Sequence, residues 1–331
     1  MRVPVRQDSP VLTSVLPVIE TSEHIRTDEA RLADVAGWLA YEELPMPQFL
    51  LPFRPNGDRD EVIDFVMVCA SIDFAFTDFR TRTKFEVEHD GRIWSDSDAL
   101  FACIGRSLAG GDDVCDGRRL RTITAEDLAV IFAGNIEMPM AEQRVVILRD
   151  VGATLVERYD GRFHKVIEAA SPRLYDGGNG LIDRLVADFP RFRDVSPYGE
   201  HSVAFYKLAQ LAVWMLYTSL DEWGGLRVDD MGKMTAFADY IVPAALQVMG
   251  ILVYSEGLDA SIRAGRLVEP DSAEEVEIRA HTIYATALLA EEVNRRRGPQ
   301  EQVIDPQIDA RLWTHFHTTA WPHHLVRTTM Y

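Results

Sequence analysis

The sequence predicts a mainly α-helical globular fold with one small β-hairpin. Apolar residues recur at helical spacing over most of the chain from Asp98 onward, and strand-like alternation is confined to the stretch around residue 90. Predicted strands do not alternate with helices, which disfavours Rossmann and TIM-barrel folds. No linker divides the chain clearly, so we expect one domain over residues 1–331; a smaller N-terminal lobe at 1–95 is the alternative.

The N-terminal part is interpreted from its prolines, acidic residues and apolar runs. We expect an extended segment over residues 1–20, followed by a helix that ends near Leu39. Four prolines predict a surface loop over 41–58. The apolar run from Val62 to Phe76 follows an acidic first turn and predicts a buried helix. An Asp-Gly turn predicts the hairpin, over residues 84–94.

The rest of the chain is expected to be helical, with glycine-rich breaks between the helices. The predicted helices cover residues 97–109, 124–132, 140–158, 162–170, 179–188, 202–221, 241–250, 257–266, 272–295 and 305–317.

One predicted helix, around Ser202–Leu220, is apolar almost all the way round and contains a single formal charge, Lys207. At helical spacing, Gln210 and Trp214 share the face of Lys207. A lysine there must reach a surface, pair with an acid or lose its proton. Lys207 and Gln210 also interrupt the apolar run, so we do not expect a membrane span.

A second charge in apolar surroundings is Asp239, within the aromatic and apolar run Met234–Tyr240. A buried lysine and a buried acid in one chain indicate a site prepared for chemistry. Asp73 has similar neighbours in Phe74 and Phe76. Flat aromatic rings with a carboxylate suit a purine-like base, whereas the alternative is that these rings are ordinary core.

Composition limits the partners. The formal net charge of −18 makes binding to a nucleic acid over a broad surface unfavourable, but one local basic pocket still suits a mononucleotide phosphate. The three cysteines are odd in number and not spaced as C-x-x-C, which argues against disulfides and structural zinc. The N-terminus lacks a signal-peptide pattern, so we expect a cytoplasmic location.

Several other motifs favour plain structural interpretations. The glycine cluster Asp176–Gly180 does not match a phosphate-binding loop. His315 and His317 point in different directions on a helix and no acid-rich ligand set surrounds them, so we expect no metal. We also expect no organic cofactor. At the start of the last long helix, we expect Glu275 and Arg279 to form a solvated pair in an acidic first turn.

Six strings along the chain resemble the queuosine salvage proteins, which are queuosine 5′-phosphate N-glycosylases. Their order and spacing agree with that family from about residue 60 to the last residue. The strings are Phe189–Val195, Val203–Gln210, Met234–Tyr240, Glu275–Arg279, Ile308–Trp313 and Arg327–Tyr331. The chain departs from the family at Asp73–Thr77, where the family often has Asn-Phe-x-Phe-Trp.

The resemblance implies a fold somewhat like helix-hairpin-helix DNA glycosylases and hydrolysis of queuosine 5′-monophosphate to queuine and ribose 5-phosphate. It implies that Asp239 is the catalytic acid and Lys207 its companion. The expected partners are this nucleotide and queuine, without nucleic acid or membrane. The expected substrate-binding residues are Asp73, Phe74, Gln210, Trp214, Phe237, Tyr240, Arg327 and Tyr331, with Lys207, Arg327 and Tyr331 as the candidate phosphate contacts.

Two other functions stay open at this point. A base-excision glycosylase would use a helix-hairpin-helix, for which Tyr240–Leu258 is the candidate segment. A non-enzymatic helical interaction protein would use its acidic surface to bind a partner.

Overall fold

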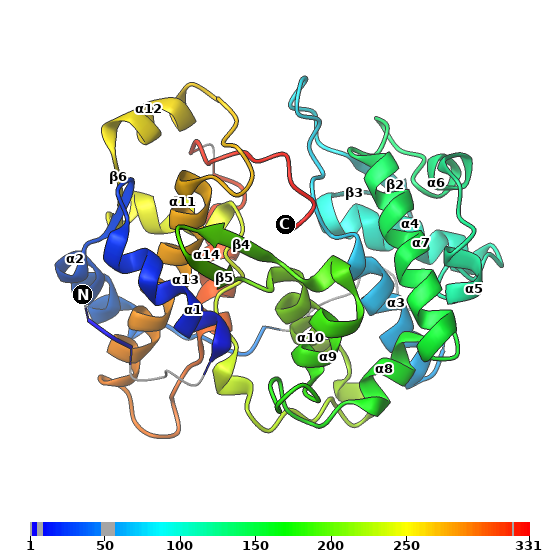
Figure 1. Ribbon diagram of the computed structural model, residues 1–331, viewed down its shortest axis with the longest axis horizontal. Coiled ribbons are helices and arrows are strands. Elements are labelled where there is room, and N and C mark those ends of the chain that lie inside the picture. The colour runs from blue at the N-terminus through cyan, green and yellow to red at the C-terminus, as the bar shows by residue number, and fades with distance from the viewer. Residues whose placement is uncertain (1, 5–8, 48–56, 320) are drawn as a thin grey trace. The chain divides into compact units, whose positions relative to one another are not determined.

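The computed structural model describes residues 2–4, 9–47, 57–319 and 321–331. It is mainly helical, as predicted, with 14 α-helices and three two-stranded antiparallel sheets among the described residues (Figure 1). The chain forms two compact units. Unit 1 comprises residues 1–47, 194–210 and 230–327, and unit 2 comprises 48–193, 211–229 and 328–331. The single-domain organisation and the likeness to helix-hairpin-helix glycosylases stay predictions.

Unit 1 is built around one long helix, α13. Helices α1 and α2 pack on it, together with α11, α14 and strand β1. The elements of unit 1 are α1 (Pro10–Thr21), β1 (Ile25–Thr27), α2 (Glu29–Leu39), β4 (Val195–Tyr198), β5 (His201–Ala204), η3 (Met231–Lys233), α11 (Ile241–Val248), β6 (Leu252–Tyr254), α12 (Glu256–Arg263), α13 (Ala273–Asn294) and α14 (Asp305–Phe316).

The expectation of an extended N-terminal segment was wrong, because α1 is a helix. Pro10 occupies its first turn, where the missing N–H costs nothing. Val11, Val15 and Val18 then recur at helical spacing and are buried against α13 and its neighbours.

At the start of α13 the predicted pair is present, with Arg279 Nη1 3.8 Å from Glu275 Oε1, but its predicted exposure was wrong, since Glu275, Glu277 and Arg279 are all nearly fully buried. Each charge has polar partners. The Glu277 carboxylate, for example, accepts hydrogen bonds from the backbone N–H groups of His24 and Ile25, at 2.6 and 2.9 Å. Burying such charges is tolerable only when they are paired in this way.

The predicted helix over 202–221 begins later than expected. Residues His201–Ala204 form strand β5, which pairs with β4, and helix α10 runs from Lys207 to Ser219. Helix α10 therefore starts in unit 1 and continues into unit 2.

Unit 2 contains a second helical cluster in which α3 packs on α4, α7 and α8. Its elements are α3 (Arg59–Ser71), β2 (Glu86–His89), β3 (Arg92–Ser95), α4 (Asp96–Ala109), α5 (Gly117–Leu120), α6 (Ala125–Ile131), α7 (Ala141–Arg158), α8 (Phe163–Ala169), α9 (Leu181–Asp188), η1 (Pro190–Phe192), the C-terminal part of α10 and η2 (Asp221–Trp223).

Two predictions for unit 2 can be compared directly with the structure. The hairpin is confirmed: β2 pairs with β3, and Asp90 and Gly91 have φ of +53° and +71°, as a type I′ turn requires. The buried helix predicted to reach Phe76 ends at Ser71, so Asp73 and Phe74 lie in the loop that follows it.

The predicted loop over 41–58 falls partly outside the described residues. Among the helices described, none combines the length and apolarity that crossing a membrane would require.

Candidate functional site

Lys207 is the first residue of α10 and is buried, with 7% of its surface exposed. Its backbone N–H donates to Asp194 Oδ2 at 3.1 Å, which satisfies one of the unpaired N–H groups at the start of the helix. The residue before it, Tyr206, has a φ of +47°. This left-handed conformation is unfavourable for a residue with a side chain, by about 1–3 kcal/mol.

Asp239 is half-buried and lies two residues before α11, whose N-cap residue is Tyr240. Its Oδ1 accepts hydrogen bonds from the backbone N–H groups of Ile241 and Val242, at 2.8 and 3.1 Å. Its Oδ2 has no hydrogen-bond partner among the described residues. The preceding residue, Ala238, has a φ of +46°, so the turn resembles the one before Lys207. The carboxylate is therefore fixed through one oxygen while the other is available.

A third ionisable residue, Asp309 on α14, interacts electrostatically with Asp239 and Lys207. Its Oδ2 accepts a hydrogen bond from the backbone N–H of Phe237 at 2.9 Å. Burial is the main cause that raises the pKa of Asp309, to about 8, and the negative charge of Asp239 adds to it. The positive charge of Lys207 acts in the opposite direction. Asp239 and Lys207 thus both act on the proton equilibrium of Asp309, and we call these three ionisable residues the charged trio.

Sequence reasoning did not select Asp309 as a site residue. The available signal was an acid between Ile308 and Leu312 on a helix, in one of the strings that carry the family resemblance. Its burial arises from the packing of α14 on α11 and α13.

Four predicted substrate-binding residues lie in unit 1. Gln210 is fully buried, and its amide bonds to Phe205 O and to the backbone and hydroxyl of Thr235. Phe237 is largely buried beside the charged trio. The ring of Tyr240 stacks on His323 with centroids 4.7 Å apart.

Arg327 is the fourth predicted substrate-binding residue in unit 1, and it is exposed. It follows Val326, which pairs with Val268 in an isolated β-bridge.

The other four predicted substrate-binding residues lie in unit 2. Asp73 and Phe74 are buried in the loop after α3, where Asp73 Oδ1 accepts a hydrogen bond from Ser97 at 2.5 Å. Trp214 stacks on Tyr217 with centroids 6.1 Å apart. The last residue of the chain, Tyr331, is also buried.

Two buried arginines hold the loop that carries Phe74. The Arg144 guanidinium lies 4.1 Å from the centre of the Phe74 ring and donates to the carbonyl oxygens of Phe74 and Ala75. The Arg191 guanidinium lies 4.9 Å from the same ring. Burial, together with the charge of Arg191, lowers the pKa of Arg144 to about 9. Ala75 has a φ of +46°, which resembles the two turns in unit 1.

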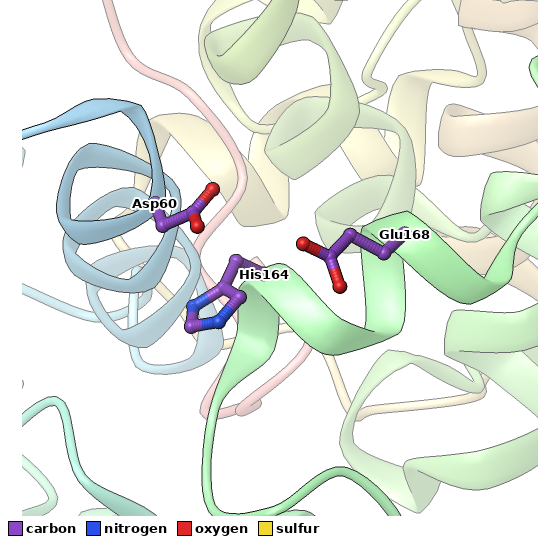
Figure 2. Close-up of side chains that lie close together, drawn as sticks. All are labelled: Asp60, His164 and Glu168. Atoms are coloured by element: carbon purple, nitrogen blue, oxygen red, sulfur yellow. The ribbon is translucent and has the colours of Figure 1, made fainter.

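Unit 2 also contains a group of side chains of the kinds that bind metals. Ligand atoms of Asp60, His164 and Glu168 lie within 4.8 Å of one another, on α3 and α8 (Figure 2). His164 Nδ1 lies 3.0 Å from Asp64, and Glu168 accepts a hydrogen bond from Lys165 Nζ at 2.8 Å. The hydrogen bonds that join α3 to α8 here are those between Asp64 and His164, so we interpret this region as a structural polar contact between the two helices.

Two surface cavities lie elsewhere in unit 1, with volumes of about 390 and 600 Å³. The first is lined by residues of α12 and of the segment that follows it, including Ser255 and Arg266. The second is lined by residues that include Tyr198 and Glu277. Neither is lined by a residue of the charged trio.

The sequence matches the model of the queuosine salvage protein family over residues 53–331, which is most of the chain. The chain belongs to the queuosine salvage protein family. It is 33% identical over 325 residues to the queuosine 5′-phosphate N-glycosylase/hydrolase of Sphaerobacter thermophilus, covering 97% of both chains. It is 26% identical over 286 residues to the protein of the same name from Bos taurus, covering 84% of this chain and 80% of that one.

A fungal member of the queuosine salvage family gives a similar result. The queuosine 5′-phosphate N-glycosylase/hydrolase of Schizosaccharomyces pombe is 26% identical over 313 residues, covering 88% of this chain and 87% of that protein. The similarity therefore extends over nearly the whole length of relatives from both bacteria and eukaryotes, and includes both units.

Proposed function

We propose that this protein hydrolyses the N-glycosidic bond of queuosine 5′-monophosphate and releases queuine and ribose 5-phosphate. The observation that carries the proposal is the end-to-end similarity to the Sphaerobacter thermophilus N-glycosylase/hydrolase. The charged trio supports it, because it provides a carboxylate with an available oxygen, together with a buried lysine, and both act electrostatically on Asp309.

In the proposed reaction, the bond between C1′ and the base nitrogen breaks and its electron pair leaves with the base. The sugar passes through an oxocarbenium-like state, so a fixed negative charge near C1′ lowers the barrier. Water then forms the new C1′–O bond. We assign the negative charge to Asp239, whose Oδ2 is available to stabilise the cation or to take the proton of the attacking water.

The N-terminus of α11 helps to hold the Asp239 carboxylate in place. Asp239 Oδ1 accepts hydrogen bonds from two backbone N–H groups at the start of α11, and these bonds fix the orientation of the carboxylate. A carboxylate that is oriented before substrate binds needs no reorganisation during the reaction, which is the main benefit of such electrostatic catalysis.

The leaving group makes this charge especially important. A 7-deazaguanine base lacks N7, where a departing purine is usually protonated. Help for the leaving base must then come from hydrogen bonds at its other edges, or the carboxylate must contribute more. Lys207 is buried and its positive charge acts on Asp309, so we assign it to binding the phosphate or a ribose hydroxyl.

The test is to incubate the purified protein with queuosine 5′-monophosphate and, in parallel, with the nucleoside queuosine, and to measure free queuine by mass spectrometry. We expect queuine from the monophosphate. Release from neither compound would contradict the proposal, and comparison of the two rates shows how much the phosphate contributes.

The alternative of a nucleic-acid glycosylase is less well supported. In the segment considered for a helix-hairpin-helix, strand β6 lies between α11 and α12 and pairs with β1, so a short hairpin does not join the two helices. The net charge of −18 also opposes binding to a polyanion.

We place the activity in the cytosol. Cys69, Cys103 and Cys115 are all buried and unpaired in disulfides, which fits a reducing compartment. Fractionation of the native cells with an antibody to the protein tests this location.

A further inference from the structure

We propose that Arg279 is a positioning residue for the reaction: its buried guanidinium fixes the two backbone turns from which Lys207 and Asp239 extend. The inference rests on the proposed function, because it concerns the geometry of the same site. It assigns a role to a residue that the reaction itself does not require as an acid, base or nucleophile.

The first part of the argument is the ion pair between Arg279 and Asp194. Their side chains are 1% and 3% exposed, and Nη1 and Nη2 of Arg279 donate to Oδ1 and Oδ2 of Asp194 at 2.9 and 2.5 Å. A bidentate pair of this kind fixes both distance and orientation. Asp194 is therefore held in a defined position.

Asp194 in turn holds three consecutive N–H groups. Its backbone carbonyl accepts hydrogen bonds from Phe205 and Tyr206, at 2.9 and 3.2 Å, and its Oδ2 accepts the N–H of Lys207 at 3.1 Å. These contacts define the turn from which α10 begins. Moving the Asp194 carboxylate would therefore move the backbone of Lys207.

Arg279 also contacts the turn before Asp239. Its Nε donates to the carbonyl oxygen of Ala238 at 3.4 Å, and its guanidinium lies 3.9 Å from the centre of the Phe205 ring. Phe205 and Ala238 belong to the same buried core cluster as residues of α1 and α13. One side chain thus contacts both turns, although the turns are far apart in sequence.

Both turns need such support because their backbones are unfavourable. Tyr206 and Ala238 have φ of +47° and +46°, a region that L-residues with a side chain seldom occupy. Such conformations persist only where surrounding contacts over-determine them. Arg279 and Asp194 supply contacts of this kind, and the residue after each strained position is a member of the charged trio.

The experiment compares Arg279→Lys with the wild type. Lysine keeps the positive charge near Asp194 but lacks the planar fork and the Nε donor that reaches Ala238. For queuosine 5′-monophosphate we expect kcat to fall about 10- to 100-fold with little change in KM, as for a small misplacement of reacting groups. Hydrogen exchange measured by mass spectrometry should become faster for the peptide that contains Phe205–Lys207.

His281→Gln is the matched control. His281 is buried on the same helix, and its two ring nitrogens contact Thr27 and Ser22 rather than either turn. We expect this variant to lower the free energy of unfolding and to leave kcat unchanged. An equal fall of kcat in both variants would reduce Arg279 to a general contribution to stability and would overturn the inference.

Two further arms keep the outcomes distinct. If Arg279→Lys does not fold, Asp194→Glu is measured in its place. The longer side chain keeps the negative charge but displaces the hydrogen bond that Asp194 accepts from the backbone N–H of Lys207, so we expect the same fall in kcat. Wild-type kcat and exchange rates in the variant would overturn the positioning role alone. A wild-type protein that does not hydrolyse the nucleotide would overturn the proposed function, and the inference with it.

Discussion

At the scale of single residues, Asp239 is the group on which the proposed chemistry depends. We expect Asp239→Asn to reduce turnover by about 10²–10³-fold or more, because the charge opposite the developing cation is lost. The amide oxygen still accepts the N–H groups that Asp239 Oδ1 accepts, so the variant should fold and bind queuine. The measurements are steady-state release of queuine and calorimetric binding of the free base. Near-normal hydrolysis would remove Asp239 from the mechanism.

Asp309 should make stability depend on pH. Its pKa is raised from an ordinary 3.8 to about 8, so between these values the folded protein retains a proton that the unfolded chain releases. Its contribution to stability is present at low pH and is lost as the pH rises, with a slope of up to about 1.4 kcal/mol per pH unit. Asp309→Asn should remove this dependence, since an amide still accepts the N–H of Phe237.

Urea unfolding between about pH 5.5 and about pH 8 measures the effect of Asp309. Asp34→Asn is the control, because the side chain of Asp34 is 74% exposed. An Asp309→Asn variant with the wild-type dependence on pH would show that Asp309 is ionised in the folded protein.

At the scale of elements, Gln210 connects α10 to the segment that leads to Asp239. Its amide has protein partners on both atoms, and Gln210→Ala would leave the N–H of Thr235 and the carbonyl of Phe205 without them. We expect a loss of about 1–3 kcal/mol in the free energy of unfolding. Chemical denaturation measures it, with the exposed Gln300→Ala as the control. An effect on KM without loss of stability would instead favour the predicted contact of Gln210 with substrate.

The elements that could be predicted from the sequence are those with local signals. The β2–β3 hairpin follows from its Asp90-Gly91 turn, and most helices of unit 2 follow from apolar periodicity and glycine breaks. The start of α10 did not, because the run from Ser202 to Tyr206 is as compatible with a strand as with a helix. Its strand conformation depends on pairing with β4, which is not visible in a local window.

The candidate site, too, could be predicted only where a residue has a local signal in the sequence. Lys207 and Asp239 were selected because a charge within an apolar run is a local anomaly. Asp309 and Arg279 were not selected from the sequence as candidate site residues, because charges on helices usually face water. Their burial follows from the packing of α13 and α14 in unit 1, and only the folded chain shows it.

At the scale of the whole molecule, the negative charge should exclude nucleic acid. With a net charge of −18, we expect no measurable binding of tRNA or duplex DNA at about 50 mM or about 200 mM salt. Fluorescence anisotropy with labelled tRNA is the measurement, with a basic RNA-binding protein as the positive control. Tight binding that weakens steeply with salt would favour the nucleic-acid glycosylase instead.

Three buried groups together predict a pH of maximum stability. Burial lowers the pKa of His281 to about 4 and that of His324 to about 3, so their contributions are present above about pH 6.5 and are lost on acidification. Asp309 acts in the opposite direction up to about pH 8. Below about pH 6.5 the two histidines together have a larger effect than Asp309, so the free energy of unfolding rises with pH. Above about pH 6.5 only Asp309 of these three groups still has an effect, so the free energy of unfolding falls with pH and its maximum lies near that value.

Thermal unfolding across this pH range checks the position of the maximum. A melting temperature that rises steadily from about pH 5 to about pH 9 would contradict the opposing effects of these groups.

The left-handed backbone conformation of Ala75, Tyr206 and Ala238 has a consequence for directed evolution of this protein. Glycine adopts such backbone angles without a steric cost, so selection for heat resistance alone should enrich glycine there. A turn that contains glycine also has more conformational freedom, so the side chains that follow it would no longer be held in one orientation. Libraries screened for survival at high temperature should therefore accumulate slow enzymes, unless catalytic rate is selected at the same time.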